Sequence, residues 1–403
     1  MKTIMILGAG IYQVPLIRRA RARGLRTVVA SIPGDYPGFA LADRVLPVNT
    51  TDRERILAAA ERENICAIAT TGTDVAMPAL GRVCDALGLP GVSLTSALKA
   101  TDKLRMKEAF RAGGVRTSDF RAVASPEEAL AAAEEIGYPV MMKIPDKSGS
   151  RGITKAETPE ALTEAWGFSR QATEAPALLV EGFVEGTEFG VDALIRHGRY
   201  RGIFPHEKLV YHSSRTGIPA GHLCPDGFSA DVREKITEQM EKLRIALELD
   251  DCAVNVDAML TPAGEVSIIE AAARCGGTGI PEALGGALET DYYDRILDLA
   301  LDEEIPGLEW IPGRAAASLL LWSGRSGTLS SVEYRAEGRT VLNGDYRGER
   351  TEVSLDVRPG ARVTAFANGT HRIGQAVFRG ESREEVRRMM EDFTACCRVR
   401  TTE

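Results

Sequence analysis

Residues 253–269 predict a β-hairpin, and no other segment constrains the fold of this chain as strongly. Two apolar, β-prone runs flank a turn at Thr261-Pro262-Ala263-Gly264. If the runs pair about this turn, Asp257 lies directly opposite Glu270. Because facing carboxylates repel across a β-ladder, we expect a cation between them. Mg²⁺ suits this place, since it takes one or two protein carboxylates and leaves its other positions to phosphate oxygens and water. The hairpin therefore predicts phosphate chemistry.

The composition is typical of a globular protein and excludes two classes of partner. The chain has 403 residues, of which 44% are hydrophobic and 26% charged. Its net charge of −8, without a long basic run, argues against nucleic acid. No apolar stretch reaches the roughly 18 residues of a membrane span. The N-terminal apolar run is too short for a signal peptide and is soon followed by Arg18 and Arg19. We therefore expect a cytoplasmic protein.

The seven cysteines form no C-x-x-C pair and no even framework. Buried or idle thiols are therefore the main expectation. Cys224 and Cys275 are the candidates for the alternative, a catalytic cysteine.

Residues 1–95 alternate strands with helices, which predicts a parallel sheet. Between a strand at 3–7 and a helix at about 14–23 lies Gly8-Ala-Gly10-Ile-Tyr-Gln13. This turn opens like a dinucleotide fingerprint but has glutamine in place of the third glycine, and the acidic residue expected after the second strand is absent. We interpret it as a tight strand-to-helix turn, although its backbone amides could still hold an anionic group.

The next region contains two lysines of interest. A single helix is predicted over residues 96–115 around Lys103, and Lys143 lies in a strand among apolar neighbours. A sheet would avoid such a charge unless it meets an anion. The segment Ser148-Gly149-Ser150-Arg151-Gly152 follows, and its backbone amides could wrap phosphate oxygens. A mobile loop without a ligand is the alternative interpretation of this segment.

The segment from Glu181 to Glu188 follows another buried strand. Extended backbone beside apolar side chains suits the edge and faces of an adenine ring, and Glu188 could accept from ribose hydroxyls. Two surface glutamates would explain the stretch equally well. Arg274 follows Glu270 by four residues and offers a fixed fork for phosphate or carboxylate, with an ion pair to Glu270 as the alternative.

Three histidines, His206, His212 and His222, accompany Lys208 and Arg215 at a spacing that matches no zinc motif. A polar loop over the active site is the preferred interpretation of this region. A plain solvated loop is nearly as good an explanation.

Short β-prone runs separated by glycines begin after Pro306, at 315–322, 339–342, 362–367 and 373–378, and a helix is predicted at 383–396. We therefore expect a small β-rich domain at 306–403.

In their order and spacing these pieces resemble the ATP-grasp ligases over about residues 1–305. Lys103 stands in Thr-Asp-Lys-x-x-Met-Lys, and Lys143 in Tyr-Pro-Val-Met-Met-Lys-Ile-Pro-Asp. The Ser148–Gly152 loop, the Glu181 segment and the carboxylate hairpin follow in the family order. The resemblance implies an α/β ATP-grasp fold with an N-terminal Rossmann-like domain and a small β-rich C-terminal domain. It places the Rossmann-like domain at 1–95 and a two-part domain, divided near residue 183, at 96–305.

The resemblance also implies a role for each matching residue. Lys143 and Arg274 would be catalytic, Arg274 by steadying an acyl phosphate. Asp257 and Glu270 would hold Mg²⁺, for which Mn²⁺ is an acceptable substitute. The implied ATP contacts are Lys103, Lys143, Ser148, Gly149, Ser150, Arg151, Gly152, Glu181, Gly182, Phe183, Val184 and Glu188. The implied substrate contacts, which rest on a weaker match, are Arg215, His222, Gly276 and Gly277.

One departure from the wider family narrows the expected activity. Many relatives carry asparagine two residues after the second metal carboxylate, where this chain has Ala272. The run Glu270-Ala-Ala-Ala-Arg-Cys-Gly-Gly is more similar to the signature of L-amino acid ligases and other carboxylate–amine ligases. We therefore expect ATP-dependent amide or peptide bond formation through an acyl phosphate, with release of ADP and phosphate. The expected partners are a small carboxylate, an amine and, as the family allows, a second copy of the chain.

Three alternatives remain from the sequence. A biotin- or purine-type carboxylase would use the same ATP site, but Ala272 argues against it. A non-catalytic ATP sensor would bind through the same residues without turnover. A dinucleotide-dependent oxidoreductase would rest on Gly8-Ala-Gly10 alone.

Overall fold

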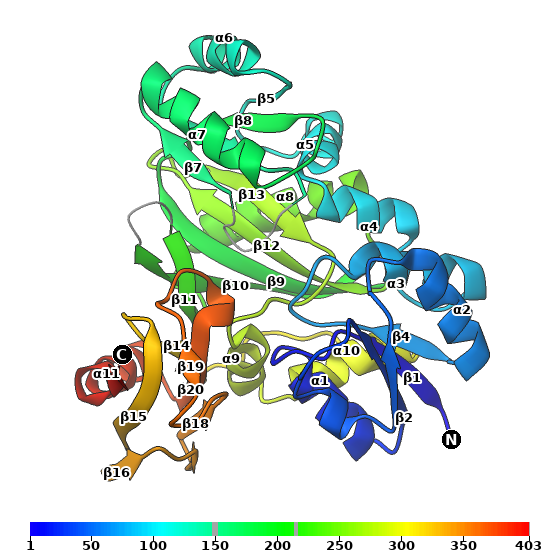
Figure 1. Ribbon diagram of the computed structural model, residues 1–403, viewed down its shortest axis with the longest axis vertical. Coiled ribbons are helices and arrows are strands. Elements are labelled where there is room, and N and C mark those ends of the chain that lie inside the picture. The colour runs from blue at the N-terminus through cyan, green and yellow to red at the C-terminus, as the bar shows by residue number, and fades with distance from the viewer. Residues whose placement is uncertain (147–151, 213–216, 403) are drawn as a thin grey trace.

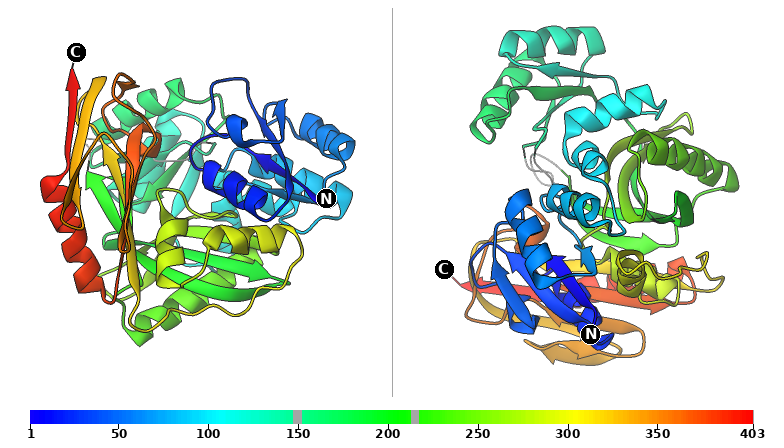
Figure 2. Two further views of the ribbon diagram at one scale, coloured as in Figure 1. Left: turned by 90° about the horizontal axis from the view of Figure 1, so that it is seen from below. Right: turned by 90° about the vertical axis from the view of Figure 1, so that its right-hand side faces the viewer.

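The protein was analysed as a computed structural model, which describes residues 1–146, 152–212 and 217–402. Figure 1 shows three smaller parts around a long central sheet. The N-terminal part lies on the right, the part formed by residues 120–182 at the top, and the C-terminal part at the lower left. The views of Figure 2 agree with this arrangement. Ser148, Gly149, Ser150, Arg151 and Arg215 lie outside the described residues.

The N-terminal part is a parallel sheet in the order β3-β2-β1-β4, as predicted. Every side chain of the first strand is buried, which explains its continuous apolar run. The strands are β1 (Thr3–Leu7), β2 (Arg26–Ser31), β3 (Arg44–Pro47) and β4 (Ala67–Ala69). The accompanying helices are α1 (Val14–Ala22), α2 (Arg53–Glu63) and α3 (Met77–Leu87).

The turn between β1 and α1 is filled by its own glutamine. The buried Gln13 side chain accepts a hydrogen bond from the Gly10 backbone N–H at 2.9 Å and donates to the Thr71 carbonyl. A Cβ on Gly8, where φ is +95°, would approach Gln13 to 2.8 Å. Gln13 therefore fills the space next to Gly8. It also accepts a hydrogen bond from the Gly10 N–H, a group with which a dinucleotide-binding turn would hold a phosphate.

The single helix predicted over 96–115 is wrong, because two helices meet at Asp102. They are α4 (Leu94–Thr101) and α5 (Lys103–Ala112). Asp102 has extended backbone, with φ −105° and ψ 115°, and its carboxylate accepts from the Arg105 backbone N–H at 3.0 Å. Aspartate favours this capping role over a helix interior. The second helix therefore begins at Lys103.

A second sheet, in the order β5-β8-β6-β7, is antiparallel and lies at the top of Figure 1. Its strands are β5 (Phe120–Val123), β6 (Val140–Lys143), β7 (Thr154–Ala156) and β8 (Leu178–Gly182). Two helices cover it, α6 (Pro126–Ile136) and α7 (Pro159–Gln171), and each follows a capping hydroxyl, Ser125 and Thr158 respectively. Gly152 lies against this layer, where a Cβ would reach Ile144 at 2.1 Å.

The central sheet has nine described strands in the order β13-β12-β9-β10-β11-β14-β20-β18-β17. Strands on both sides of residue 306 belong to it, because β11 pairs with β14. Its strands are β9 (Thr187–Arg196), β10 (Arg199–His212), β11 (Gly217–Cys224), β12 (Cys252–Leu260), β13 (Val266–Ala272), β14 (Ala315–Trp322), β17 (Tyr346–Arg347), β18 (Thr351–Leu355) and β20 (Arg372–Gly380).

Among the helices that pack on this sheet are α8 (Ala230–Ala246), α9 (Ile280–Ala287) and α10 (Tyr292–Ala300). Of these three, the sequence predicts only α10, at residues 292–301. The surface of α8 is so rich in charge that its buried residues, among them Ile236, Met240 and Leu243, form a sparse stripe. The glycines of α9 weaken the helical signal in the sequence. Gly286 nevertheless allows the helix to pack closely on the sheet, because a Cβ there would approach Ala316 to 2.7 Å.

The C-terminal part adds a second layer behind β14 and β20. Its strands are β15 (Gly327–Ala336), β16 (Arg339–Leu342), β19 (Arg362–Val363) and β21 (Arg398–Thr402), and α11 (Arg383–Cys396) has the bounds that were predicted. The strand predicted at 362–367 is shorter than expected. Among the described residues, no helix combines the length and apolar character needed to cross a membrane.

Candidate functional site

The predicted hairpin is present, and Asp257 pairs directly with Glu270. Its turn is closed by a hydrogen bond from the Gly264 backbone N–H to the Thr261 carbonyl at 2.9 Å. The register shifts by a β-bulge just after Asp257, so the two strands are one residue out of step beyond it. The two carboxylates therefore lie on one face of the sheet.

Lysines supply the positive charge between these carboxylates. Lys208 Nζ lies 2.9 Å from Asp257 Oδ1 and 2.6 Å from Glu188 Oε1, and Lys103 Nζ lies 3.0 Å from Glu270 Oε1. Both lysine side chains are buried, at 5% and 7% exposure. Burial opposes the charge of Lys208, but Asp257 and Glu188 raise its pKa above the usual value. The opposed pair is thus stable without a metal.

The same face of the central sheet carries a polar stripe across five strands. Direct cross-strand pairs place Asn255 beside Asp192, and His206 beside Gly190. A Cβ on Gly190 would come within 2.1 Å of the His206 ring, so glycine makes room for it. The opposite face is apolar and packs into the core that includes Val191, Val254, Val256 and Ile268. The members of the stripe are Glu270, Asn255, Asp257, Glu188, Asp192, His206, Lys208 and His222.

The histidines are not in a polar loop, so that interpretation was wrong for the two described imidazoles. His206 and His222 are buried on β10 and β11, at 0% and 2% exposure. His206 Nε2 lies 3.1 Å from Asp192 Oδ2, and the two Nδ1 atoms are 3.3 Å apart. His222 Nε2 reaches Thr278 Oγ1 at 2.7 Å. Burial, with His206 and Lys208, lowers the pKa of His222 well below its usual value, so this ring is neutral.

A second charged cluster joins the upper sheet to α5. Glu181 Oε2 lies 2.9 Å from both Lys143 Nζ and Lys107 Nζ. Burial raises the pKa of Glu181, but the two lysines outweigh it and hold the value at about 2. Burial likewise lowers the pKa of Lys107 to about 8, with Glu181 opposing this effect and Lys143 adding to it. Sequence reasoning missed Lys107, although it ends the Thr-Asp-Lys-x-x-Met-Lys motif.

Lys103 lies near this cluster. It stands one helical turn before Lys107, and its backbone N–H donates to the Pro145 carbonyl at 3.1 Å, just beyond Lys143. The start of α5 and the end of β6 are therefore in contact. Lys103 and Lys107 of α5 thus gather with Lys143 of β6 between the upper sheet and the polar stripe.

The Glu181 segment is the connection between the upper sheet and the central sheet (Figure 1). The Glu181 side chain is turned toward the lysines, and its backbone lies between β5 and β6. The Gly182 and Phe183 N–H groups donate to the Asp119 and Pro139 carbonyls at 2.9 and 3.1 Å. Val184 follows, half-buried, before β9 begins.

Arg274 is held by the N-terminal part and not by Glu270. Its Nε lies 2.7 Å from Asp74 Oδ1, and its Nη1 donates to Asn255 Oδ1 at 3.0 Å. The Gly276 N–H then donates to Asp192 Oδ1 at 3.0 Å. Arg274 and the following glycine loop are thereby fixed to the polar stripe. Asp74 lies in a loop, and no sequence pattern indicated it as the partner of Arg274.

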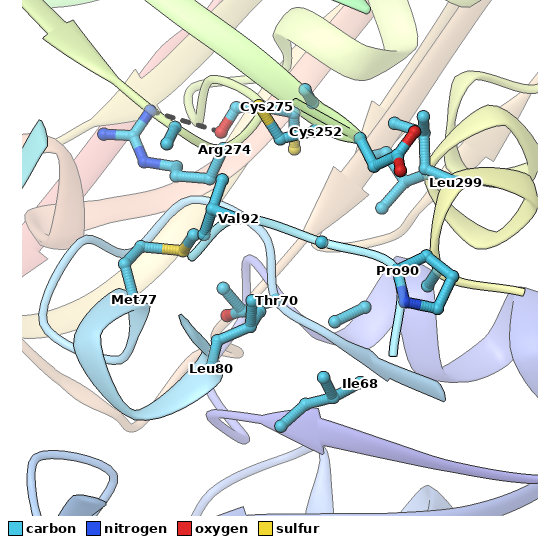
Figure 3. Close-up of a pocket in the computed structure, with 17 residues that line it drawn as sticks. Ile68, Thr70, Met77, Leu80, Pro90, Val92, Cys252, Arg274, Cys275 and Leu299 are labelled. Atoms are coloured by element: carbon cyan, nitrogen blue, oxygen red, sulfur yellow. Dashed lines mark hydrogen bonds between the residues drawn. The ribbon is translucent and has the colours of Figure 1, made fainter. Parts of the chain in front are cut away.

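A well-formed cavity of about 50 Å³ lies between β4, α3, β12 and α10. Its lining is largely apolar, and Figure 3 shows Arg274 at its edge, where Nη1 donates to the Cys275 carbonyl at 3.2 Å. Burial raises the pKa of Cys275 to about 12 and that of Cys224 well above its usual value. These thiols are unsuited to nucleophilic catalysis. The cavity belongs to the packing between two sheets.

The residues present fit a magnesium site of a particular kind. Among the described residues, no group of three His, Cys, Asp or Glu side chains gathers as a protein metal cage would require. Asp257 and Glu270 offer a pair of carboxylates, partly exposed at 37% and 29%. A pair of this kind suits Mg²⁺ that shares its coordination with phosphate oxygens and water.

Comparison with known proteins agrees with this arrangement. Residues 136–282 match the family model described as an ATP-grasp domain. Over these residues the chain is similar to ATP-grasp domains. An L-amino acid ligase from Bacillus licheniformis superposes with a TM-score of 0.82 at 18% identity, over 100% of this chain and 99% of that one. A phosphoribosylglycinamide synthetase from Anaerococcus prevotii superposes with a TM-score of 0.80 at 26% identity, over 100% of both chains.

A curated relative, the alanine–anticapsin ligase of Bacillus subtilis (strain 168), is 26% identical over 270 residues. This match covers 61% of the chain and 56% of that ligase. The chain thus spans about half the length of the curated relatives it matches first. The fold class expected from the sequence, ATP-grasp, is confirmed.

Proposed function

We propose that the protein is an ATP-dependent carboxylate–amine ligase. A carboxylate oxygen of the first substrate attacks the γ-phosphorus of ATP, and the bond to ADP breaks to give an acyl phosphate. The amine then attacks the acyl carbon and displaces phosphate, leaving an amide. The protein's part is positioning and charge stabilisation, as is usual for phosphoryl transfer.

The observation that carries this proposal is the gathering of cations beside the opposed carboxylates. Lys103 and Lys143 would hold ATP phosphates, and Lys208 would balance the carboxylates at the sheet face. If phosphate oxygens of ATP replaced the carboxylates that these lysines now contact, each buried lysine would still have a negatively charged partner. The backbone at Glu181 and Val184 would meet the adenine edge, and Glu188 the ribose. The segment 148–152 would close over the phosphates.

Asp257 and Glu270 would hold Mg²⁺, or Mn²⁺ in its place, and the ion would supply positive charge beside the phosphates. Arg274, fixed by Asp74 and Asn255, would steady the acyl phosphate. Gly276 and Gly277, which line a small pocket with Tyr12, and His222, which contacts Thr278, would lie on the substrate side. A second copy of the chain stays an expectation of the family resemblance.

The names of the curated relatives favour ligation over carboxylation, whereas the similar solved structures also include biotin carboxylases. An alanine–anticapsin ligase and an L-amino acid ligase are both named for joining amino acids. The residue that pairs with Asn255 across the hairpin is Ala272, which cannot ligate a metal. We therefore place a carboxylase second and a non-catalytic sensor third.

The test is a panel of amino acids and small carboxylates, singly and in pairs, screened for phosphate release with ATP and Mg²⁺. The expected result is release that depends on a carboxylate and an amine together, with an amide found by mass spectrometry. Release with bicarbonate alone would support the carboxylase. Tight ATP binding without release for any pair would support the sensor.

A further inference from the structure

A network of buried hydrogen bonds runs from the polar stripe to the loop after Arg274. His206 Nε2 lies 3.1 Å from Asp192 Oδ2, and the Nδ1 atoms of His206 and His222 are 3.3 Å apart. At the outer end, His222 Nε2 lies 2.7 Å from Thr278 Oγ1. Asp192 and both imidazoles are at most 2% exposed, whereas Thr278 is half-buried. We call these four residues the histidine network. It connects the interior to a side chain that a ligand can reach.

Thr278, at the outer end of the network, is held in an unusual conformation. Its φ of +52° is left-handed, which is uncommon and costly for a β-branched residue. Two contacts hold it there: Ser318 Oγ donates to its carbonyl at 2.9 Å, and its hydroxyl meets His222. Such strain persists only where the surroundings impose it, and it collects at functional sites. The conformation keeps the hydroxyl at the end of the histidine network.

The carboxylate at the buried end decides the direction of each hydrogen bond in the network. Asp192 Oδ2 accepts from Asn255 Nδ2 at 2.9 Å, and as a carboxylate it also accepts from His206 Nε2. A neutral His206 then has an unprotonated Nδ1, which accepts from His222 Nδ1. His222 Nε2 is left unprotonated and accepts from the Thr278 hydroxyl. The Thr278 oxygen thus donates inward, and its lone pairs can accept from a donor outside the network.

The network can take up one proton through rearrangement of its hydrogen bonds alone. When the Thr278 oxygen gains a proton from outside, its own proton passes to His222 Nε2, and the proton on His222 Nδ1 passes to His206 Nδ1. His222 stays neutral throughout, in agreement with its lowered pKa. The positive charge arises on His206, the ring that lies beside Asp192. A carboxylate in this place stabilises an imidazolium that has taken the proton of a hydroxyl group.

We propose that the histidine network accepts the proton of the attacking amine through Thr278. The inference rests on the proposed ligase function and adds a proton acceptor to its second step. The amine nitrogen bonds to the acyl carbon, and the bond from that carbon to the phosphate oxygen breaks, its electron pair leaving with phosphate. The proton of the nitrogen passes to Thr278 Oγ1 as the Thr278 proton enters the network. It returns by the same path to phosphate or water.

The position of Thr278 suits this role. It lies in the same loop as Arg274, the residue proposed to steady the acyl phosphate, and next to Gly277 on the proposed substrate side. Thr278 would be the catalytic residue, because it alone of the network meets the amine. His206, His222 and Asp192 would act through it.

The first arm of the test compares Thr278→Val, Thr278→Ser and the control Ser318→Ala. Valine keeps the shape of threonine but has no hydroxyl, so kcat for amide formation should fall at least about 100-fold, a typical value for general base catalysis. KM for ATP should stay unchanged, and ADP should exceed amide because the acyl phosphate is hydrolysed. Thr278→Ser should restore most of the amide. Ser318→Ala loses the hydrogen bond to the Thr278 carbonyl but no step of the proton path, so it should keep the wild-type ratio of amide to ADP.

Three outcomes of this arm would overturn the inference. They are amide formation by Thr278→Val at the wild-type rate, an equal loss in Thr278→Ser, and an equal loss in Ser318→Ala. The last two would mean that the loop needs only its shape.

Hydroxylamine as the amine separates proton transfer from positioning. It is unprotonated at neutral pH and attacks acyl phosphates without help from a base. Thr278→Val and His206→Gln should therefore lose much less activity with hydroxylamine, measured as hydroxamate, than with the amine substrate. The double variant should lose no more amide formation than Thr278→Val, because both changes interrupt one path. An equal loss with both nucleophiles would contradict proton transfer.

The tautomers of the two rings test the network without any turnover. Nitrogen NMR of the wild type with isotope-labelled histidine should show His206 protonated at Nε2 alone and His222 at Nδ1 alone, with His206→Gln and His222→Gln to assign the signals. A proton on His222 Nε2 at rest would overturn the inference, and the ligase proposal would stand. If no carboxylate yields ADP with any amine, hydroxylamine included, the ligase proposal itself fails and this role of the network fails with it.

Discussion

Charged side chains of opposite sign alternate across one face of the central sheet. Lys103 meets Glu270, and Lys208 bridges Asp257 and Glu188, each within 3.0 Å. Every one of these contacts joins residues far apart in the sequence. Buried or half-buried charges of this kind hold their partners firmly, because removal of one partner leaves the other uncompensated.

Replacement of Glu270 by alanine should lower the rate of ADP formation at least about 100-fold, a typical loss for one electrostatic contact in a transition state. It removes a proposed metal ligand and the partner of Lys103. The measurement is kcat with the substrate pair found in the screen. Glu265→Ala is the matched control, since Glu265 lies in the same hairpin but pairs with Lys235 and Arg116 at the turn. Near-normal ADP release by Glu270→Ala would refute the metal assignment.

The buried Glu181 should make stability depend on acid pH. Its pKa is about 2 in the folded protein against an ordinary 4.5, so its contribution is complete above about pH 4.5 and is lost as the pH falls toward 2. Urea unfolding of wild type and Glu181→Gln should therefore differ most at pH 6 and converge at acid pH. Glu185→Gln, at a nearby exposed position, should follow the wild type throughout. A constant difference across this range would contradict the predicted linkage.

At the scale of the elements, the break between α4 and α5 decides where Lys103 points. Asp102 ends one helix and caps the next, so Lys103 is the first residue of α5. Had one helix continued through residues 96–115, Lys103 would have been an ordinary interior position. The cap also brings Lys107 to the same side, one turn later, beside Glu181.

The mutation Asp102→Ala should cost about 1 kcal/mol of stability, the usual value of an N-cap, and should also raise KM for ATP. The second effect is expected because the first turn of α5 carries Lys103. Ser125→Ala removes a comparable cap from α6 in the upper layer, where Ser125 accepts from the Glu128 N–H at 3.2 Å. That variant should lose similar stability, measured by urea unfolding, and keep its KM. Equal KM values for the two variants would contradict a positioning role for Asp102.

For the whole molecule, the central sheet unites regions that the sequence divides. It runs from β13 to β17, and the pairing of β11 with β14 crosses the boundary expected near residue 306. Leu223 of β11 packs with Ala317 and Phe378 in one core. The C-terminal strands therefore protect an edge of the sheet that carries the polar stripe.

A chain ending at residue 305 should consequently aggregate or unfold, because β11 would become a bare edge and part of a core would be exposed. Soluble yield and size-exclusion chromatography are the measurements. The control ends at residue 397 and loses only β21, whose side chains are largely exposed and which pairs with β15 alone. This shorter deletion should leave a folded protein. A monodisperse, cooperatively unfolding 1–305 fragment would show that the sheet does not depend on its C-terminal strands.

Local patterns in the sequence were sufficient for much of this fold. Alternating strands and helices predicted the N-terminal parallel sheet, and the turn residues 261–264 predicted the hairpin. The pairing of Asp257 with Glu270 was also predicted, but it depends on a β-bulge after Asp257 that the sequence did not indicate. Such features depend on neighbours within a few residues. Elements with weak local signals were missed, notably the charged α8 and the glycine-containing α9.

The sequence by itself determined which chemical groups this protein possesses, in an order characteristic of ATP-grasp proteins. Only the tertiary structure decided their partners. The sequence around His206, Lys208 and His222 predicted a polar loop over the active site, yet β10 and β11 bury these side chains in the stripe. Arg274 stands near Glu270 in the sequence but binds Asp74. The physical reason is that charge pairing and burial depend on which strands become neighbours in the sheet. Short-range sequence patterns do not show which strands will be neighbours.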